Sequence, residues 1–237
     1  MSSMLQLCSK CNNSFYLNNV ICIGHAKLQN INCPYCNNIL PIASSGVPKT
    51  SKIRLTQELP SKALLQAFNS SNKYKNFKNC VYHITSKKNL CSIMQEGLLP
   101  YFDLKAKGMN VETGGDDNSL NIDHCLGLDK YIHLSFTSWC PMFFRNKQKR
   151  GDLILLHIKL DVIDQPNVIF CDRIATARDA IFYNNLDFNF FDFEAVYGYS
   201  DWKTKEGQER RSKTEKYEIL VPNHIPPDKI IGTTALE

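Results

Sequence analysis

The sequence predicts an α+β fold in which short strands outnumber helices. Residues 219–221 form an apolar run with two β-branched members, closed by Pro222, which is typical of a buried strand stopped by a turn. A second strand is predicted far upstream, at residues 80–85. Further short strands are predicted at 131–136, 152–160, 168–170 and 230–231. Many strands with few helices favour a core of antiparallel or split sheets.

Length and composition predict a folded protein without a membrane span. The chain has 237 residues, of which 43% are hydrophobic, enough for one good-sized domain with a small appendage. It has no run of 18 apolar residues and no charged segment followed by an apolar one near its start. We therefore expect no membrane span, no secretory signal and a cytoplasmic location. The formal net charge of +5 mildly favours a polyanionic partner.

Residues 1–40 are predicted to form a zinc ribbon. Ten cysteines in a chain without an export signal favour metal ligation over disulfides. Two C-x-x-C pairs, separated by about twenty residues, would complete a tetrahedron of thiolates around a structural zinc. Cys22 or His25 could replace one of these ligands, and four unrelated core cysteines are the alternative. The expected ligands are Cys8, Cys11, Cys33 and Cys36.

Residues 41–77 are predicted to be a linker, punctuated by Pro, Gly and Ser. One helix is expected within it at 61–68, with Ser61 as N-cap and Leu64, Leu65 and Phe68 on one face. The main domain is expected to span residues 78–237.

The main domain is expected to contain one clear helix after its first strand. Ser86 caps it, Gly97 ends it, and Leu90, Ile93 and Met94 are spaced for one buried face. The polar stretch 101–128 is too long for a simple connection and is therefore expected to be functional or mobile. A helix-like piece at 175–183 and a charged loop at 203–216 complete the domain.

Several motifs of the main domain resemble the DarT family. They are Val81-Tyr82-His83-Ile84-Thr85, the helix from Asn89 to Leu99, Pro141-Met142-Phe143, Phe170-Cys171-Asp172, Arg210-Arg211, and Glu218-Ile219-Leu220-Val221-Pro222 with Ile225-Pro226. That family comprises bacterial toxins that transfer ADP-ribose from NAD to bases of single-stranded DNA. The order and spacing of the motifs over residues 78–237 carry the resemblance, and the zinc ribbon lies outside it.

The resemblance implies an ADP-ribosyltransferase-like split β-sheet core with NAD in the cleft between its halves. It makes Glu218 the catalytic glutamate and places His83, catalytic as well as cofactor-binding, at the NAD ribose or amide. Thr85, Asn89 and Ser135 complete the expected NAD site. A solvated strand end is the alternative for Glu218. A core histidine that donates to a backbone carbonyl is the alternative for His83.

One departure from the family pattern concerns an arginine. The family places it just before the Pro-Met segment, whereas no arginine precedes Pro141 here. Either Arg145 takes its catalytic place from the next turn, or the chain belongs to a divergent branch that modifies a different base.

Two basic clusters and an aromatic residue are the expected nucleic-acid surface. Lysine and arginine would hold backbone phosphates, and Trp139 could stack on an unpaired base. Solvated loops are the alternative for either cluster. The expected basic contacts are Arg145, Lys147, Lys149, Arg150, Arg210 and Arg211.

The function expected from these features is NAD-dependent ADP-ribosylation of a base of single-stranded DNA. A carboxylate suits this chemistry because breaking the ribose–nicotinamide bond develops positive charge on the ribose. The resemblance also implies a toxin of a toxin–antitoxin system, active in phage defence and neutralised by a macrodomain antitoxin that removes ADP-ribose. The alternatives are the same transfer to RNA or protein, or a non-catalytic zinc-ribbon protein that binds nucleic acid.

Overall fold

The computed structural model describes most of the chain after residue 58. Backbone alone is described for 4–7, 14–17, 30–32, 39–41 and 117–118. Backbone and side chains are described for 59–69, 73–112, 119–139, 141, 151–199, 201 and 203–236.

The N-terminal strands form two antiparallel hairpins. β1 (Met4–Leu7) pairs with β2 (Ser14–Leu17), and β3 (Asn30–Asn32) pairs with β4 (Ile39–Pro41). All four cysteines of the predicted zinc site, and both Cys22 and His25, lie outside the described residues.

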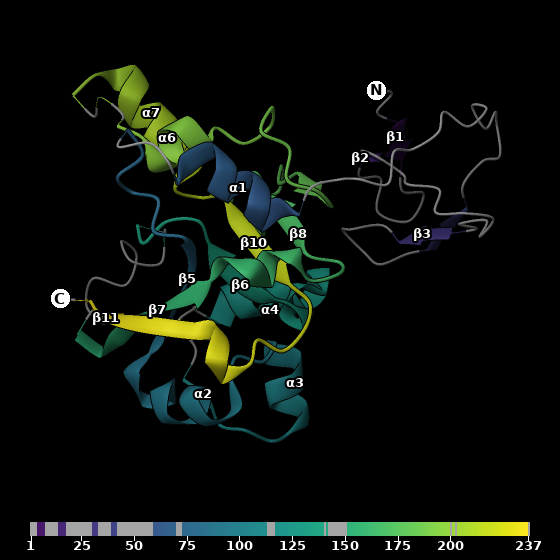
Figure 1. The fold of residues 1–237 in the computed structure, drawn as a ribbon. Coiled ribbons are helices and arrows are strands. Elements are labelled where there is room, and N and C mark those ends of the chain that lie inside the picture. The colour runs from purple at the N-terminus through teal and green to yellow at the C-terminus, as the bar shows by residue number, and fades with distance from the viewer. Residues whose placement is uncertain are drawn as a thin grey trace.

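The main domain is organised around one seven-stranded sheet, in which every pair of neighbours is antiparallel (Figure 1). The order is β11-β7-β5-β6-β10-β8-β9. Its strands are β5 (Cys80–Ser86), β6 (Ile132–Ser135), β7 (Leu153–Lys159), β8 (Ile169–Cys171), β9 (Phe182–Tyr183), β10 (Glu218–Val221) and β11 (Ile230–Ala235).

The two halves of this sheet meet at a very narrow junction. β5 pairs with β7 from Cys80 to Ser86, but it pairs with β6 only between Tyr82 and Ser135. The predicted split is therefore wrong in one respect, because the described strands form a single continuous sheet. Beyond that one residue pair, no further ladder pairing joins the described residues of β5 and β6. This gap in the hydrogen-bonded ladder is where a ligand can approach both strands.

Helices cover the sheet from two sides (Figure 1). On one side lie α1 (Pro60–Phe68), α6 (Phe193–Tyr197) and α7 (Lys205–Thr214). On the other lie α2 (Leu90–Glu96) and α3 (Tyr101–Ala106). The 3-10 turn η2 (Leu128–Lys130) contacts both α3 and α4 (Asp117–Leu126). Further 3-10 turns are η1 (Lys87–Asn89), η4 (Leu160–Asp164) and η5 (Pro227–Lys229).

Strand β10 separates the main core from a smaller apolar cluster. Ile219 and Val221 are fully buried in the main core, which also contains the aromatic residues of α1 and α6. Leu220 points the other way and packs with Leu128 and Cys171. Because side chains alternate along a strand, Glu218 shares the face of Leu220, toward η2. This face carries the candidate site.

The helix after β5 ends where the sequence predicts, but Ser86 caps the 3-10 turn η1 that precedes it, and α2 itself starts at Leu90 with Asn89 as N-cap. The Ser86 hydroxyl accepts a hydrogen bond from the Lys88 N–H, and Gly97 ends α2 with φ of 82°. A Cβ at Gly97 would lie 2.2 Å from the Ile225 carbonyl oxygen, so glycine is required there for steric reasons as well. Ile93 is buried as expected, but the prediction for Met94 is wrong because it is 47% exposed.

Helix α1 packs into the main core through Leu64 and Phe68, which are buried. The prediction that Ser61 is its N-cap is wrong, because the helix starts at Pro60 with Leu59 as N-cap. Ser61 lies in the first turn, and its N–H and hydroxyl both donate to the Asp164 carboxylate.

Two later expectations about helix and loop are also wrong. Residues 175–183 are not a helix: Asp172 accepts a hydrogen bond from the Ile181 N–H and closes this segment as a loop that leads into β9. The charged stretch 203–216 is largely helical, as α7. Thr204 caps it by accepting from the Gly207 N–H, a short-range signal that outweighs the lack of apolar periodicity.

Candidate active site

A cavity of about 360 Å³ lies where the two halves of the sheet meet. This volume is within the range of small-molecule sites. Strands β5 and β6 form its floor, and much of its wall comes from the polar stretch 101–128. The wall residues from that stretch are Tyr101, Leu104, Met109, Val111, Glu112, Ser119, Leu120 and Asp123.

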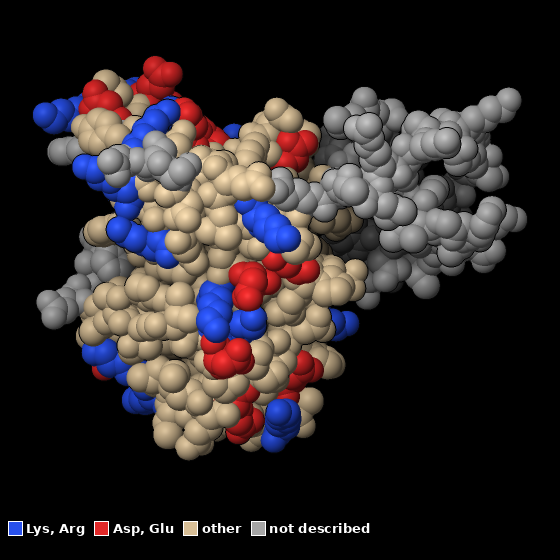
Figure 2. All heavy atoms as spheres, in the orientation of Figure 1, with Lys and Arg blue, Asp and Glu red and all other residues tan. Residues whose placement is uncertain are grey.

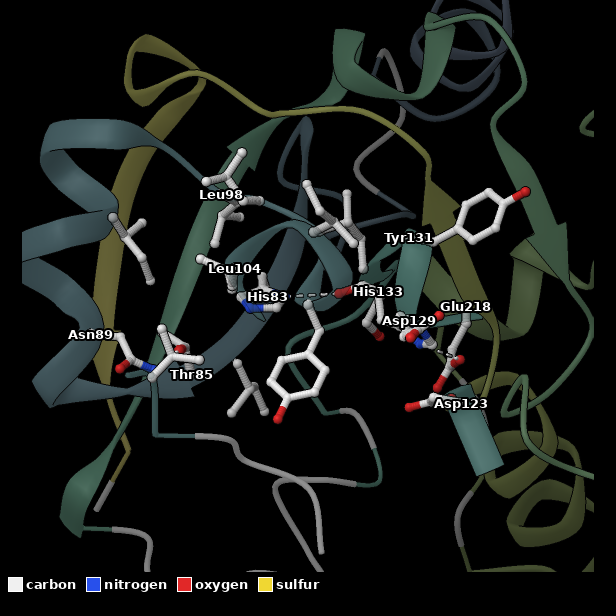
Figure 3. Close-up of a pocket in the computed structure, with 18 of the residues that line it drawn as sticks. His83, Thr85, Asn89, Leu98, Leu104, Asp123, Asp129, Tyr131, His133 and Glu218 are labelled. Atoms are coloured by element: carbon white, nitrogen blue, oxygen red, sulfur yellow. Dashed lines mark hydrogen bonds and ion pairs between the residues drawn. The ribbon is translucent and has the colours of Figure 1, made fainter. Parts of the chain in front are cut away.

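Glu218 enters this cavity from the start of β10, where its backbone pairs with Ser135 on one side and Cys171 on the other (Figure 3). Its side chain is 20% exposed. Oε2 accepts a hydrogen bond from the Ala175 N–H at 3.0 Å and lies 3.5 Å from His133 Nδ1. Among the described residues none forms a hydrogen bond with Oε1. One oxygen of the carboxylate is therefore fixed, and the other is available to a ligand.

His133, on β6, lies beside Glu218 in the cavity. Its Nε2–H donates to the Leu128 carbonyl at 3.2 Å, and its Nδ1 faces Glu218. Desolvation alone would lower the pKa of His133, but the Glu218 and Asp123 carboxylates and the Leu128 carbonyl together raise it to about 9. His133 is therefore a cation at neutral pH.

Asp123, on α4, is a second carboxylate in the same cavity (Figure 3). Its Oδ1 is buried and has no hydrogen-bond partner among the described residues. Desolvation raises the pKa of Asp123, and Glu218 and Asp129 raise it further, while His133 opposes them. Asp129 is itself buried and forms an ion pair with His124 at 2.7 Å.

His83, on β5, forms a hydrogen bond through Nδ1 with the His133 carbonyl at 2.9 Å. Because a carbonyl can only accept, Nδ1 carries the proton. Desolvation lowers the pKa of His83, so the ring is neutral and Nε2 keeps a lone pair. His83 therefore does donate to a backbone carbonyl through Nδ1, as the alternative interpretation expects. The ring still lines the cavity, where Nε2 can accept from a ribose hydroxyl or an amide.

Thr85, Asn89 and Ser135 all line the cavity, as expected for an NAD site. The Asn89 amide nitrogen donates to the Thr85 hydroxyl at 3.1 Å and to the Glu112 carbonyl at 2.7 Å, and its oxygen accepts from the Glu112 N–H. Asn89 thus links the backbone of Glu112, in the wall of the cavity, to the start of α2. The Ser135 hydroxyl is buried beside Glu218, at the junction of the sheet halves.

The expected DNA-binding residues fall into two groups. Four of them, Arg145, Lys147, Lys149 and Arg150, lie outside the described residues. Trp139 is 49% exposed and stands two residues before Pro141, which lines the cavity. An exposed indole is suited to stacking on a base.

Arg210 and Arg211 lie on α7 and bind acidic residues of the protein itself. Arg210 forms an ion pair with Asp192, which in turn caps α6, and Arg211 pairs with Glu215 at 2.5 Å. Figure 2 shows acidic and basic side chains interleaved over this end of the molecule. Both arginines therefore have acidic partners within the protein, and their expected binding of phosphates stays a prediction.

Sequence reasoning missed His133 and Asp123. The signal for His133 was present: it stands two residues before Ser135 in an alternating strand, so both side chains share one face. Asp123 had only the general signal that a long polar stretch within a domain is functional or mobile.

The fold and the site define an ADP-ribosyltransferase. A glutamate at the start of β10 and a neutral histidine on β5, with β6 between these strands, line one cavity of an antiparallel sheet. A family model described as "ssDNA thymidine ADP-ribosyltransferase, DarT" matches residues 82–235, which is more than half of the chain. The chain therefore belongs to the DarT family.

Two solved structures share this fold. Thermosipho africanus DarTG in complex with ADP-ribose is 19% identical with a TM-score of 0.53, and the match covers 65% of this chain and 43% of that one. Thermus sp. 2.9 DarT in complex with ADP-ribosylated ssDNA is 16% identical with a TM-score of 0.52, and the match covers 67% of this chain and 82% of that one. The chain thus matches less than half of the Thermosipho protein. No curated protein matches the sequence.

Within the part of the chain that the structure describes, no helix is long and apolar enough to cross a membrane.

Proposed function

We propose that this chain transfers ADP-ribose from NAD to the thymine base of single-stranded DNA, with Glu218 as the catalytic carboxylate. The observation that carries the proposal is the position of Glu218: one oxygen is fixed by the Ala175 N–H, and the other is open to the cavity. The family assignment supports the substrate. So do the relatives, one solved with ADP-ribose and one with ADP-ribosylated single-stranded DNA.

The reaction exchanges one bond at the ribose carbon C1′ for another. The bond from C1′ to nicotinamide breaks, and nicotinamide leaves with the bonding electrons. The ring nitrogen of thymine, after losing its proton, forms the new bond to C1′. Glu218 can stabilise the positive charge that develops on the ribose and can accept the proton from the thymine N–H, the only N–H of that base.

Three other cavity residues would position NAD. His83 Nε2 would accept from a ribose hydroxyl or from the nicotinamide amide, because its Nδ1 is already occupied. Thr85 and Asn89 would shape the wall beside the dinucleotide, and Ser135 would approach the ribose from the junction of the sheet halves.

The DNA would lie across the Trp139 end of the cavity, with Trp139 stacking on a base. Arg145 would supply the positive charge that the family draws from an arginine before the Pro-Met segment, and residues 147–150 would hold phosphates. Because Arg210 and Arg211 form ion pairs with acidic residues of the protein, we leave them outside this proposed surface.

The N-terminal segment would bind one structural zinc through Cys8, Cys11, Cys33 and Cys36. Its support is the spacing: each C-x-x-C pair falls in sequence between the two strands of an antiparallel hairpin, β1–β2 or β3–β4. Metal analysis of protein purified without chelator should give one zinc per chain. Protein free of zinc would overturn this assignment.

The biological role that follows is a toxin acting on DNA in the cytoplasm, with phage defence as its use. A macrodomain antitoxin that removes ADP-ribose would neutralise it, in line with the DarTG match. The alternative substrates, RNA and protein, keep the same NAD chemistry and are separated by experiment.

The test is transfer of label from radioactive NAD. Separate reactions should contain single-stranded DNA with thymine, the same DNA with every thymine replaced by uracil or cytosine, RNA of matching sequence, and a protein mixture. We expect label on the thymine-containing DNA above all others. Label on RNA or protein instead, or on none of the pools, would contradict the proposed substrate or the proposed activity, respectively.

A further inference from the structure

His133 lies diagonally across the sheet from Glu218. In the β6–β10 ladder Glu218 pairs with Ser135, and Leu220 pairs with His133. Residues two positions apart on paired strands share a face and are within reach of long side chains. The ladder itself therefore places the His133 ring against the Glu218 carboxylate, at 3.5 Å from Nδ1 to Oε2.

Charged groups face the His133 ring from several elements. Glu218 approaches from β10 and Asp123 from α4, and the neutral His83 ring contacts the His133 carbonyl from β5. Asp129, on η2, also lines the cavity and is hydrogen-bonded to His124. Carboxylates therefore outnumber cations around this ring in the described part of the cavity. Such surroundings favour the imidazolium over the neutral ring.

Both ring nitrogens of His133 have acceptors as partners. Nε2 must carry a proton, because the Leu128 carbonyl can only accept. A neutral ring would therefore turn the Nδ1 lone pair toward the Glu218 carboxylate. Only the protonated ring attracts that carboxylate, so the charge state of His133 decides where Glu218 Oε2 is held.

We propose that His133 is a positioning residue for Glu218: its protonated ring, together with the Ala175 N–H, fixes Oε2 and aims Oε1 at the ribose. The inference rests on the proposed function, because it assigns a role within the same site. Asp123 belongs to this arrangement as the second carboxylate that keeps the ring charged. Deprotonation of His133 at alkaline pH then releases Glu218 and lowers turnover.

The first test measures the ring directly and needs no turnover. NMR titration of the histidine Cε1–H signals, with His133→Gln used to assign the resonance, should show His133 titrating near pH 9. In Glu218→Gln the same signal should titrate at least one pH unit lower. Titration of wild-type His133 near its ordinary value of 6.5, or no change in Glu218→Gln, would overturn the proposal.

The second test follows the rate of transfer to DNA against pH. Wild type should lose kcat as pH rises through about 9, and Asp123→Asn should move this loss to lower pH. His133→Gln should lower kcat at pH 7 by about tenfold to a hundredfold, with KM for NAD nearly unchanged, since a charge-assisted hydrogen bond is lost. Its remaining activity should lack the alkaline loss.

His157→Gln is the matched control, because His157 lies on β7 and forms a hydrogen bond with Thr234 outside the cavity. It should keep the wild-type rate and pH profile. A His133→Gln variant with the rate and alkaline loss of wild type would overturn the positioning role while leaving the proposed function intact. Wild type without any transfer to DNA, but with His133 titrating as expected, would contradict the proposed function alone.

Discussion

The cavity and helix α7 both concentrate charged residues, but they do so in opposite ways. On α7 and beside it, Arg210 pairs with Asp192 and Arg211 pairs with Glu215 on a largely exposed surface. In the cavity, two carboxylates, Glu218 and Asp123, share one cation, His133.

The difference shows why a count of charges does not locate a functional site. Exposed ion pairs are screened by water and contribute little, so the protein can use them freely to fasten a helix. A buried carboxylate oxygen that finds no partner among the described residues, such as Asp123 Oδ1, is costly unless a ligand or a reaction uses it. The pKa values of Arg210 and Asp192 are shifted chiefly by their hydrogen bond to each other, whereas in the cavity desolvation is the first cause of the shifts of Asp123 and His83.

The largest effect should come from Glu218→Gln, which keeps the shape of the side chain and removes its charge. If the carboxylate acts in the transition state, kcat should fall by about 10²–10³ with KM for NAD nearly unchanged. Transfer of labelled ADP-ribose to thymine-containing DNA measures it.

Glu209→Gln on α7 is the matched control, because Glu209 is exposed and forms an exposed ion pair with Lys205. It should leave the rate within twofold. If Glu218→Gln also keeps kcat within twofold of wild type, its carboxylate has no catalytic role, and Glu218 is a structural residue like Glu209. Melting of Glu218→Gln should be followed alongside, so that a folding defect is recognised.

A smaller effect should appear in the pH dependence of unfolding. The folded-state pKa of His133 is about 9 against an ordinary 6.5, so its stabilisation is complete below pH 6.5 and is lost as pH rises through 9. The loss is at most about 3 kcal/mol, at 1.36 kcal/mol for each pH unit of the shift. His83 and His157, whose pKa values are lowered, change charge only at acid pH and do not contribute in this window.

Chemical denaturation at pH 6.5, 8 and 9.5 measures this loss. His133→Gln should flatten the decline in unfolding free energy, whereas His157→Gln should follow wild type. A decline of equal size in all three proteins would assign the pH dependence to other titratable groups. It would also mean that the interaction between Glu218 and His133 does not contribute to the unfolding free energy.

The smallest effect should come from Arg210→Ala. Removing one partner of an exposed pair should cost about 0.5 kcal/mol of unfolding free energy. Because Arg210 is held by Asp192, affinity for single-stranded DNA should change by less than twofold. Affinity is measured by fluorescence anisotropy at fixed salt, and a steep loss in Arg210→Ala would show that α7 contacts the DNA. Trp139→Ala is the positive control for that measurement, since Trp139 is exposed and precedes by two residues Pro141, which lines the cavity.

The sequence by itself determined the elements whose causes are local. The strands β5 and β10 and the helix α2 with its Gly97 stop follow from apolar periodicity, capping and steric need, all of which act over a few residues. The family resemblance followed from the order of those elements and is confirmed over residues 82–235. The catalytic role of Glu218 stays a prediction, supported by its place at the mouth of β10.

Only the tertiary structure decided which side chains share the cavity. His133 and Glu218 are 85 positions apart in the sequence, and the ladder between β6 and β10 brings them together. Asp123 comes from α4, whose contacts with η2 no local pattern specifies. Ion-pair partners could not be predicted from the sequence either, since Arg210 forms an ion pair with Asp192 because α7 packs on α6. Electrostatic roles depend on distance and burial, and both are properties of the folded chain.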